Sequence, residues 1–368
     1  MAEYDVCVIG GGLLGSAFGW GLVREGQRCV VLDEGDGAIR TARGNFGLVW
    51  LQSKGRGMPE YARWTLEATR IWGGFADELK DITGIDLHYA KGGYNIGADE
   101  AELAQMVANL NQIQSEMGDD AYDYEVLDQA RLKREMPLVG DVAGATYTAH
   151  DGHCNPLLLL RAMQQAFQAK GGAYRPNSGV RSVEILPGGG FRILGQNGAE
   201  LARAAKVVLS AGHGSARLAK DLGIDLPIHP EQGQVLVTEK VAPVMPHPAM
   251  SVRQTDNGSF LLGASKKEVD LDTRTDLETL ATIAASCIRL FPFLGRLRLQ
   301  RAWGALRVMT PDGHPVYQQS ESHPGLFSFA CHSGVTLAAC HALHVSKWVI
   351  DGTIPDTYSA FHPRRFHV

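Results

Sequence analysis

The chain has 368 residues, which exceeds the usual size of a single hydrophobic core and predicts two domains. Hydrophobic residues make up 45% of the sequence and charged residues 20%, which are the proportions of an ordinary globular protein. The net charge is −5 and no basic run stands out, so nucleic acid is not expected as the main partner. No secretory signal precedes the first apolar run, and the cytoplasm is therefore the expected compartment.

The cysteine and histidine residues show neither a disulfide framework nor a metal-binding pattern. Six cysteines are scattered without a Cys-x-x-Cys pair, and in a reducing compartment they are expected to be small buried apolar residues. Of the thirteen histidines, His341 and His344 stand at helical spacing, but their segment is apolar and favours packing over metal binding. We therefore expect no metal.

The opening residues carry the strongest motif in the sequence. An apolar run enters a Gly-x-Gly-x-x-Gly turn at Gly10, Gly12 and Gly15, and a helix-like segment then leads to a second apolar run that ends at Asp33. In a βαβ dinucleotide fingerprint, these glycines allow the tight turn, the approach of a pyrophosphate and close helix packing. The phosphates would lie at the helix N-terminus. Asp33 is expected at the ribose, with Glu34 as the near alternative.

The next segment predicts a loop followed by helices and one strand. Residues 35–47 form a polar, glycine-rich loop that either approaches a cofactor or is an ordinary surface connection. Over residues 59–79 the spacing of apolar residues predicts a helix with one buried face. Further elements are expected as a strand at 92–97 and helices at 99–117 and 128–135.

A second alternating block of strands and helices begins at Asp151. Asn155 is a suitable N-cap and Pro156 a favoured first helical residue, so a helix is predicted over 156–170. Short strands are expected next at 179–183, 190–194 and 206–212. The last of them ends on small residues, which leave room for a ligand at the carboxyl end of the strand.

The last part of the chain predicts a mixture of strands and helices. The expected elements are strands at 233–238, 259–263 and 326–330, and helices at 277–291 and 335–350. The final helix is apolar, but it is too short to span a membrane and carries two histidines and a lysine, so a buried core helix is expected.

Several stretches taken together resemble the FAD-dependent D-amino-acid oxidase family, which includes glycine oxidase and sarcosine oxidase. The stretches that carry this similarity are residues 10–15, Asp151–Pro156, Val207–Leu218, Gly304–Pro315 and Ser333–Ala338. Within the family, residues 43–50, 331–337 and 364–366 are most similar to the flavin-bearing subunits of bacterial opine, D-hydroxyproline and cyanide-forming glycine dehydrogenases.

The resemblance implies an α/β fold, α+β overall, in which a Rossmann-like FAD-binding domain joins a mixed-sheet substrate domain. Both domains are expected to be discontinuous in sequence. The FAD-binding domain would comprise residues 1–84, 149–225 and 299–368, and the substrate-binding domain residues 85–148 and 226–298.

The resemblance also implies which residues contact FAD. The expected cofactor-binding residues are Gly10, Gly12, Leu14, Gly15, Asp33, Glu34, Arg43, Asn45, Gly47, Val180, Ala211, Gly212, Ser333, Gly334, Val335 and Thr336. Among these, the last three would present a helix N-terminus to the flavin, where its dipole stabilises the negative charge of the reduced ring.

The sequence departs from the family pattern at three places. Val308 follows Arg307 where the family favours proline, which leaves the local turn uncertain. Sarcosine oxidases link the flavin through a cysteine near this segment, whereas this chain has Met309, so FAD is expected to be noncovalent. His332 stands about where glycine oxidase places an arginine near the substrate, which argues against glycine as the substrate.

The implied reaction is oxidation of the C–N bond of a small amino acid or secondary amine to an imine, by hydride transfer to flavin N5. Arg307 is the candidate that holds the substrate carboxylate, because a guanidinium forms a bidentate pair with it. The alternative is a structurally paired arginine. His332 is a candidate for binding or deprotonating the amine, or a packing residue. Trp50, Tyr94 and Tyr317 are candidates for lining the substrate pocket, although aromatic residues more often belong to the hydrophobic core.

The fate of the electrons stays open at the level of sequence. An oxidase passes them to O2, in the manner of glycine and sarcosine oxidases, and a lysine at Lys266 or Lys267 can assist that step. A dehydrogenase passes them to a partner subunit or a quinone, which would associate the protein with a membrane through its acceptor. The sequence is also compatible with a non-catalytic FAD-binding subunit and with a nicotinamide dehydrogenase.

Overall fold

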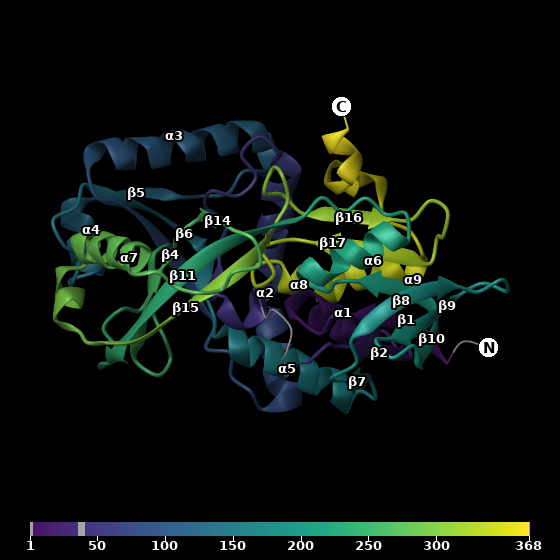
Figure 1. Ribbon diagram of the computed structural model, residues 1–368. Coiled ribbons are helices and arrows are strands. Elements are labelled where there is room, and N and C mark those ends of the chain that lie inside the picture. Colours follow the sequence, from purple (N-terminus) through teal and green to yellow (C-terminus); the bar gives the residue numbers. More distant parts are fainter. Residues whose placement is uncertain (1–2, 36–40, 368) are drawn as a thin grey trace.

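In the computed structural model, residues 3–35 and 41–367 are described, and they form three β-sheets flanked by helices (Figure 1). Residues 36–40 of the predicted glycine-rich loop lie outside this part of the chain. The eight-stranded sheet lies at one end of the molecule and the two smaller sheets at the other (Figure 1).

The glycine turn leaves the centre of the largest sheet. Strand β1 (Tyr4–Ile9) pairs in parallel with β2 (Cys29–Leu32) on one side and β10 (Glu200–Leu209) on the other. The sheet continues in parallel to β7 (Ala173–Arg175) beyond β2 and to β17 (Leu326–Ala330) beyond β10. Antiparallel pairs add β16 (Val316–Gln319), β8 (Val180–Ile185) and β9 (Phe191–Gly195).

Both faces of this sheet are buried, as a parallel sheet requires. Along β1, Val6 and Val8 belong to one hydrophobic core, which includes residues of helices α1 (Leu13–Arg24) and α5 (Pro156–Ala169). The alternate residues Cys7 and Ile9 belong to a second core on the opposite face. The carboxyl end of β1 is therefore fixed from both sides where the glycine turn begins.

The two smaller sheets are antiparallel and share a core. The five-stranded sheet contains β11 (His229–Lys240), β12 (Val252–Gln254), β13 (Ser259–Gly263), β14 (Lys267–Glu268) and β15 (Leu299–Met309). The four-stranded sheet contains β3 (Leu48–Val49), β4 (Ala90–Gly97), β5 (Glu125–Asp128) and β6 (Gly144–His153). Side chains of both sheets meet in one hydrophobic core, for example Ile96 of β4 and Phe260 of β13.

The remaining helices of the described chain surround these sheets. They are α2 (Pro59–Thr83), α3 (Glu100–Met117), α4 (Gln129–Glu135), α6 (Ser215–Asp221), α7 (Leu277–Leu290), α8 (Ala338–Cys340) and α9 (Ser346–Asp351). Short 3-10 turns occur at Thr41–Gly44, Gly118–Asp120, Gly212–Gly214, Pro292–Arg296, Asp356–Phe361 and Pro363–Phe366, and a π-helical turn at His341–Val345. As predicted, Asn155 caps α5 by accepting hydrogen bonds from the backbone N–H groups of Leu157 and Leu158.

Two long strands were not predicted from the sequence. Strand β6 lacks the regular apolar alternation that predicts a strand, because its buried residues include Thr146 and Asp151. Both polar side chains form hydrogen bonds with buried Gln52. Strand β15 pairs with β11 from Leu299 to Met309. The domain boundary expected between residues 298 and 299 therefore separates two strands of one sheet, and the division into two domains stays a prediction.

The helix predicted over 335–350 is shorter and is interrupted. It begins at Ala338, and the π-helical turn separates α8 from α9. Residues before it form turns, in which the N–H of Leu337 donates to the carbonyl of Ser333 at 2.9 Å. The hydroxyl of Thr336 accepts from Trp50 N–H at 3.1 Å and donates to the Leu48 carbonyl at 3.3 Å, which ties this segment to β3.

Candidate active site

The glycine turn between β1 and α1 fits only residues without a side chain at two positions. A Cβ added to Gly15 would lie 1.7 Å from the Gly10 carbonyl oxygen, and one added to Gly10 would lie 2.5 Å from Ala211 Cα. Gly10 also has φ of +102°, a conformation that glycine adopts without strain. By contrast, a Cβ on Gly12 would meet nothing nearer than Ala42 Cβ at 4.0 Å, so this residue faces open space.

Asp33 holds the glycine turn in place. Its carboxylate is buried and accepts hydrogen bonds from Gly11 N–H at 2.8 Å and from Gly35 N–H at 3.0 Å. The carboxylate therefore links the end of β2 to the first turn after β1. Its neighbour Glu34 is exposed and lines the same cavity, as the near alternative for the ribose.

A cavity of about 550 Å³ begins at this turn, a volume typical of ligand pockets. Of the residues predicted from sequence to bind cofactor or substrate, those that line it are Gly10, Gly12, Leu14, Asp33, Glu34, Arg43, Asn45, Val180, Ala211, Gly212, His332 and Gly334. Those that do not are Gly15, Gly47, Trp50, Tyr94, Arg307, Tyr317, Ser333, Val335 and Thr336.

The cavity fits a dinucleotide by the nature of its walls. Gly12 is the N-cap of helix α1, and no side chain of the described residues bonds to the first N–H groups of the helix, so these groups can meet phosphate oxygens. The same cavity is lined by Asp33 and Glu34 after β2, by Ala330 at the end of β17 and by His332 just beyond it.

Sequence reasoning missed several residues that line the cavity. Gln164 of α5 donates to the Gly11 carbonyl at 3.0 Å, and Arg217 of α6 donates to the Val180 carbonyl at 2.9 Å. Tyr174 and His213 also line the cavity. Gln164 and Tyr174 lie on elements that reach the cavity only through the fold, and no local motif marks them. His213 and Arg217 lie within Val207–Leu218, one of the stretches that carry the family resemblance, but were not singled out as site residues.

Beside His332, the structure brings together three cationic side chains from distant parts of the sequence. Lys54 follows β3, Lys266 precedes β14, and Arg307 lies on β15. Lys54 Nζ is 3.1 Å from His332 Nε2. Burial, together with Lys54, Arg307 and Lys266, holds the pKa of His332 well below its usual range, so this imidazole is neutral.

Arg307 already has a partner in the protein. Its Nη1 lies 2.7 Å from Glu231 Oε1 and its Nη2 donates to the Ser265 carbonyl at 3.0 Å. Glu231 lies opposite Arg307 in the β11–β15 pair, so the sheet register sets this ion pair. A guanidinium has five N–H donors, and the others can meet a ligand.

Lys54 is a site residue that sequence reasoning did not identify. It is half-buried, and no Asp or Glu of residues 3–35 and 41–367 forms an ion pair with it. Burial, followed by the nearby charges of Lys266 and Arg307, lowers the pKa of this ammonium to about 8. A lysine five residues after Val49, in a loop without a motif, gives no signal in the sequence.

Asp151 positions the loop that carries Lys54. Its buried carboxylate accepts from the N–H groups of Leu51 and Gln52 at 2.5 and 3.2 Å, and from Gln52 Nε2 at 2.6 Å. Burial raises the pKa of this carboxyl to about 7, although the three hydrogen bonds and Lys54 oppose the shift. The resemblance had marked Asp151 only as the start of a helical segment.

The structure does not bring the predicted aromatic residues to the cavity wall. The Tyr94 hydroxyl donates to Glu135 Oε2 at 2.6 Å within the core of the smaller sheets. Tyr317 is buried in the main core, where its hydroxyl accepts from Trp64 Nε1 at 3.2 Å and lies 2.7 Å from His341 Nε2. Trp50 is also buried, and its indole N–H has no partner among the described residues.

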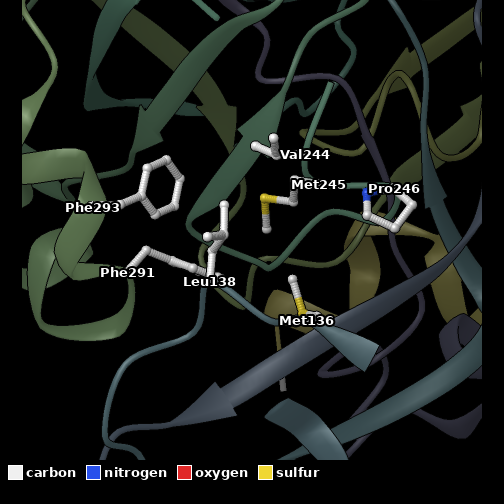
Figure 2. Close-up of a pocket in the computed structure, with 7 residues that line it drawn as sticks. All are labelled: Met136, Leu138, Val244, Met245, Pro246, Phe291 and Phe293. Atoms are coloured by element: carbon white, nitrogen blue, oxygen red, sulfur yellow. The ribbon is translucent and has the colours of Figure 1, made fainter. Parts of the chain in front are cut away.

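A second hollow lies in the region of the smaller sheets and is too small for a ligand. Its volume is about 10 Å³, roughly the room that one water needs. Figure 2 shows the apolar side chains around it: Met136, Leu138, Val244, Met245, Pro246, Phe291 and Phe293.

Over the described residues, no group of three or more His, Cys, Asp or Glu side chains is arranged to hold a metal. No helix in the same residues is long and apolar enough to cross a membrane.

The βαβ glycine turn, the acid after β2 and the buried parallel sheet define a dinucleotide-binding protein with an antiparallel sheet beside its cofactor cavity. Comparison of sequences defines it further. The chain belongs to the FAD-dependent oxidoreductase family known as DAO, whose sequence profile matches residues 5–348. FAD is therefore the cofactor, and the chain is an oxidoreductase.

Two named relatives match this chain over its whole length. An opine oxidase subunit of Agrobacterium tumefaciens (strain Ach5) is 40% identical over 100% of this chain and 99% of its own length. The protein of the same name from Rhizobium meliloti is 38% identical over 100% and 98%. Glycine oxidase of Bacillus subtilis (strain 168) is 24% identical over 85% of this chain and 83% of its own.

Solved structures share the fold. Glycine oxidase from Geobacillus kaustophilus superposes with a TM-score of 0.86 at 22% identity and covers 98% of each chain. L-proline dehydrogenase from P. horikoshii gives a TM-score of 0.85 at 19% identity, over 100% of this chain and 98% of its own. These matches confirm the predicted D-amino-acid oxidase-like α/β fold.

Proposed function

We propose that this chain oxidises the C–N bond of an amino acid whose nitrogen is a secondary amine, of the opine type, to an imine that water then hydrolyses. The observation that carries the proposal is the group of Lys54, Lys266 and Arg307 beside His332. Of these four residues His332 lines the FAD cavity, and the three cations lie behind it. Within the described part of the chain, Arg307 alone of the three cations has a carboxylate partner at the site, so the surplus positive charge suits a substrate with carboxylates. Two relatives that share the full length are named as a subunit of opine oxidase.

When bound, FAD accepts the hydride, and the protein contributes position and charge. Arg307, held by Glu231 and the Ser265 carbonyl, is the proposed contact for one substrate carboxylate. A guanidinium whose orientation is fixed in advance holds a carboxylate with little loss of side-chain entropy. Lys266 is exposed and lies near enough to influence Lys54 and His332, so a second carboxylate can meet it.

A second protein chain as partner is part of this proposal. Both relatives named opine oxidase are a single subunit of that enzyme by name, and their alignments leave almost no part of this chain unmatched. The electrons would then pass to another subunit or a quinone. Transfer to O2, as the name of the glycine oxidases implies, is the alternative, and exposed Lys266 is the residue that would assist it.

The test is an anaerobic titration of the purified flavoprotein with glycine, sarcosine, D-proline, D-hydroxyproline, octopine and nopaline. We expect an opine to bleach the flavin absorbance and glycine to leave it unchanged. Readmission of air then separates the acceptors, because fast recovery indicates an oxidase and slow recovery a dehydrogenase. A bound flavin that none of the six compounds bleaches would contradict the proposal.

A further inference from the structure

We propose that Lys54 takes a proton from the substrate ammonium before oxidation, and that His332 holds the lysine side chain in position for this step. The inference rests on the proposed function, because the proton concerned is that of the substrate ammonium. It assigns a catalytic role to a residue that carries no recognisable motif.

The chemistry requires a group of this kind. A hydride leaves carbon only as the nitrogen lone pair forms the C=N bond, and an ammonium has no free lone pair. Alkyl ammonium groups lose their proton near the ordinary lysine pKa of about 10.4, so at neutral pH the substrate arrives protonated. One proton must therefore leave nitrogen in each turnover, and a base at the site can take it from the bound ammonium at neutral pH.

The other titratable groups at the site are unsuited to this task. His332 Nε2 lies 3.1 Å from Lys54 Nζ and 3.5 Å from Ser333 Oγ, so two polar groups of the protein already lie within hydrogen-bond distance of this nitrogen. The cations around His332 also oppose its protonation. Glu231 is paired with Arg307, and the Asp151 carboxylate accepts three hydrogen bonds from the Lys54 loop.

Lys54 meets the requirements by its contacts. Its side chain has one hydrogen-bond partner among the described residues, His332 Nε2. In the imidazole tautomer whose Nε2 is unprotonated, this nitrogen accepts from the amine as well as from the ammonium, and the neutral amine keeps its lone pair for the substrate proton. The charged and titratable groups that affect the Lys54 ammonium are Lys266, Cys331, Arg307 and Asp151, and Lys54 in turn affects His332 and His314.

The surroundings also keep Lys54 neutral often enough to act as a base. Burial and the two cations disfavour its ammonium form, which brings its pKa to about 8. A general base is most effective when its pKa lies near the working pH. The step balances in atoms and charge: the ammonium loses H⁺ to the Lys54 amine, the neutral substrate loses hydride from carbon to FAD, and Lys54 later returns the proton to solvent.

The experiment compares wild type with Lys54→Met and Lys54→Arg. Arginine keeps the positive charge but does not accept a proton, so it separates a base from a simple carboxylate contact. Anaerobic stopped-flow measures the rate of flavin bleaching at saturating substrate from pH 6.5 to 10.5. We expect both variants to be at least about 100-fold slower than wild type at pH 7, and within about threefold of it at pH 10.5, where about half of the substrate amine is itself deprotonated.

The control is Lys133→Met, which removes an exposed lysine of α4 that pairs with Asp141 at 3.9 Å and should leave the rate and its pH profile unchanged. Flavin content and thermal midpoint establish that each variant is folded. A Lys54→Arg variant that keeps more than one third of the wild-type rate at pH 7 would overturn the role as a base.

A second measurement does not depend on turnover. Protein labelled with ¹³C at lysine Cε is titrated by NMR, and the signal missing in Lys54→Met identifies Lys54. A midpoint near 8 is expected, and a midpoint near the ordinary value overturns the proposal whatever the kinetics show. A wild-type flavin that no amine bleaches contradicts the proposed function instead, whereas bleaching of wild type and of Lys54→Arg at equal rates contradicts only the role of Lys54.

Discussion

The two ends of the cofactor cavity are built in different ways. At the glycine turn, backbone groups and small residues form the wall, and Gly10, Gly12 and Asp33 lie within about thirty positions of each other along the chain. At the other end, Lys54 after β3, Lys266 before β14 and Arg307 of β15 surround the neutral imidazole of His332. The first end is a property of one βαβ unit, whereas the second exists only after all three sheets have assembled.

The difference explains what each end can tolerate. A glycine whose missing Cβ leaves room for backbone cannot be replaced by any other residue, because no side chain can move out of the way. Charged side chains at the other end can be exchanged without collision, so their replacement should change affinity and rate while the fold persists. Substitutions at the two ends should therefore fail in distinguishable ways.

The largest effect is expected for Gly15→Ala at the glycine turn. Its Cβ would lie 1.7 Å from the Gly10 carbonyl oxygen and 2.9 Å from Ser210 Oγ, so helix α1 would have to separate from β1. We expect loss of bound flavin and a free energy of unfolding reduced by more than about 3 kcal/mol, measured by flavin absorbance and urea denaturation.

Gly74→Ala is the matched control for this prediction. Gly74 lies inside helix α2, and an added Cβ there meets no atom within 4 Å in the described structure. Alanine favours a helix over glycine by about 1 kcal/mol, so this variant should retain its flavin and be slightly more stable. Equal flavin content in the two variants would mean that the packing of Gly15 is not what forms the site.

The contrast between a locally determined glycine turn and a charged end that depends on tertiary structure also explains which features could be predicted from the sequence. The glycine turn, Asp33, the Asn155 cap and the strands around them were predicted because local spacing and local hydrogen bonds determine them. Strand β6 was missed because its inward residues are polar and are satisfied by Gln52, which is ninety-four positions from Thr146. Lys54 was missed because its environment comes from Lys266, Arg307 and His332, which only the tertiary structure places beside it.

A smaller effect is expected for Arg307→Met at the charged end. Removing the guanidinium takes away the proposed carboxylate contact, and we expect KM to rise about 100-fold, which corresponds to the 2–5 kcal/mol usual for truncating a charged pair. The change should appear in steady-state or stopped-flow kinetics with the substrate that bleaches the wild-type flavin. Flavin content should stay at the wild-type level, unlike that of Gly15→Ala.

The double variant Arg307→Met, Glu231→Gln separates substrate binding from internal pairing. Glu231 has only 18% of its side chain exposed, so in the single variant it is left as a largely buried carboxylate without its cation. If Arg307 serves only to neutralise Glu231, the double variant should recover most of the wild-type KM. We expect no recovery, because the proposed contact with the substrate is absent from both variants.

The smallest effect is expected for Lys54→Met, which should raise the free energy of unfolding, whereas Gly15→Ala should lower it. The folded-state pKa of Lys54 is about 8, below the ordinary value of 10.5, so between these two values the unfolded chain binds more protons than the folded one. Stability therefore rises with pH across this window, and the full cost of burying the ammonium is present below pH 8. Lys54→Met removes that cost, and partial exposure of the side chain limits the gain to about 1–2 kcal/mol at pH 7.

The measurement is urea denaturation at pH 7 and pH 10, with Lys133→Met as the control that should gain nothing at either pH. The gain from Lys54→Met should shrink at pH 10, where the wild-type lysine is already neutral. A gain of equal size at both values would indicate better packing of methionine and not relief of a buried charge. If Lys54→Met both bleaches the flavin slowly and gains stability in a pH-dependent way, the buried lysine at the charged end lowers the stability of the fold and is needed for the reaction. The glycine turn, by contrast, is needed for both stability and the reaction.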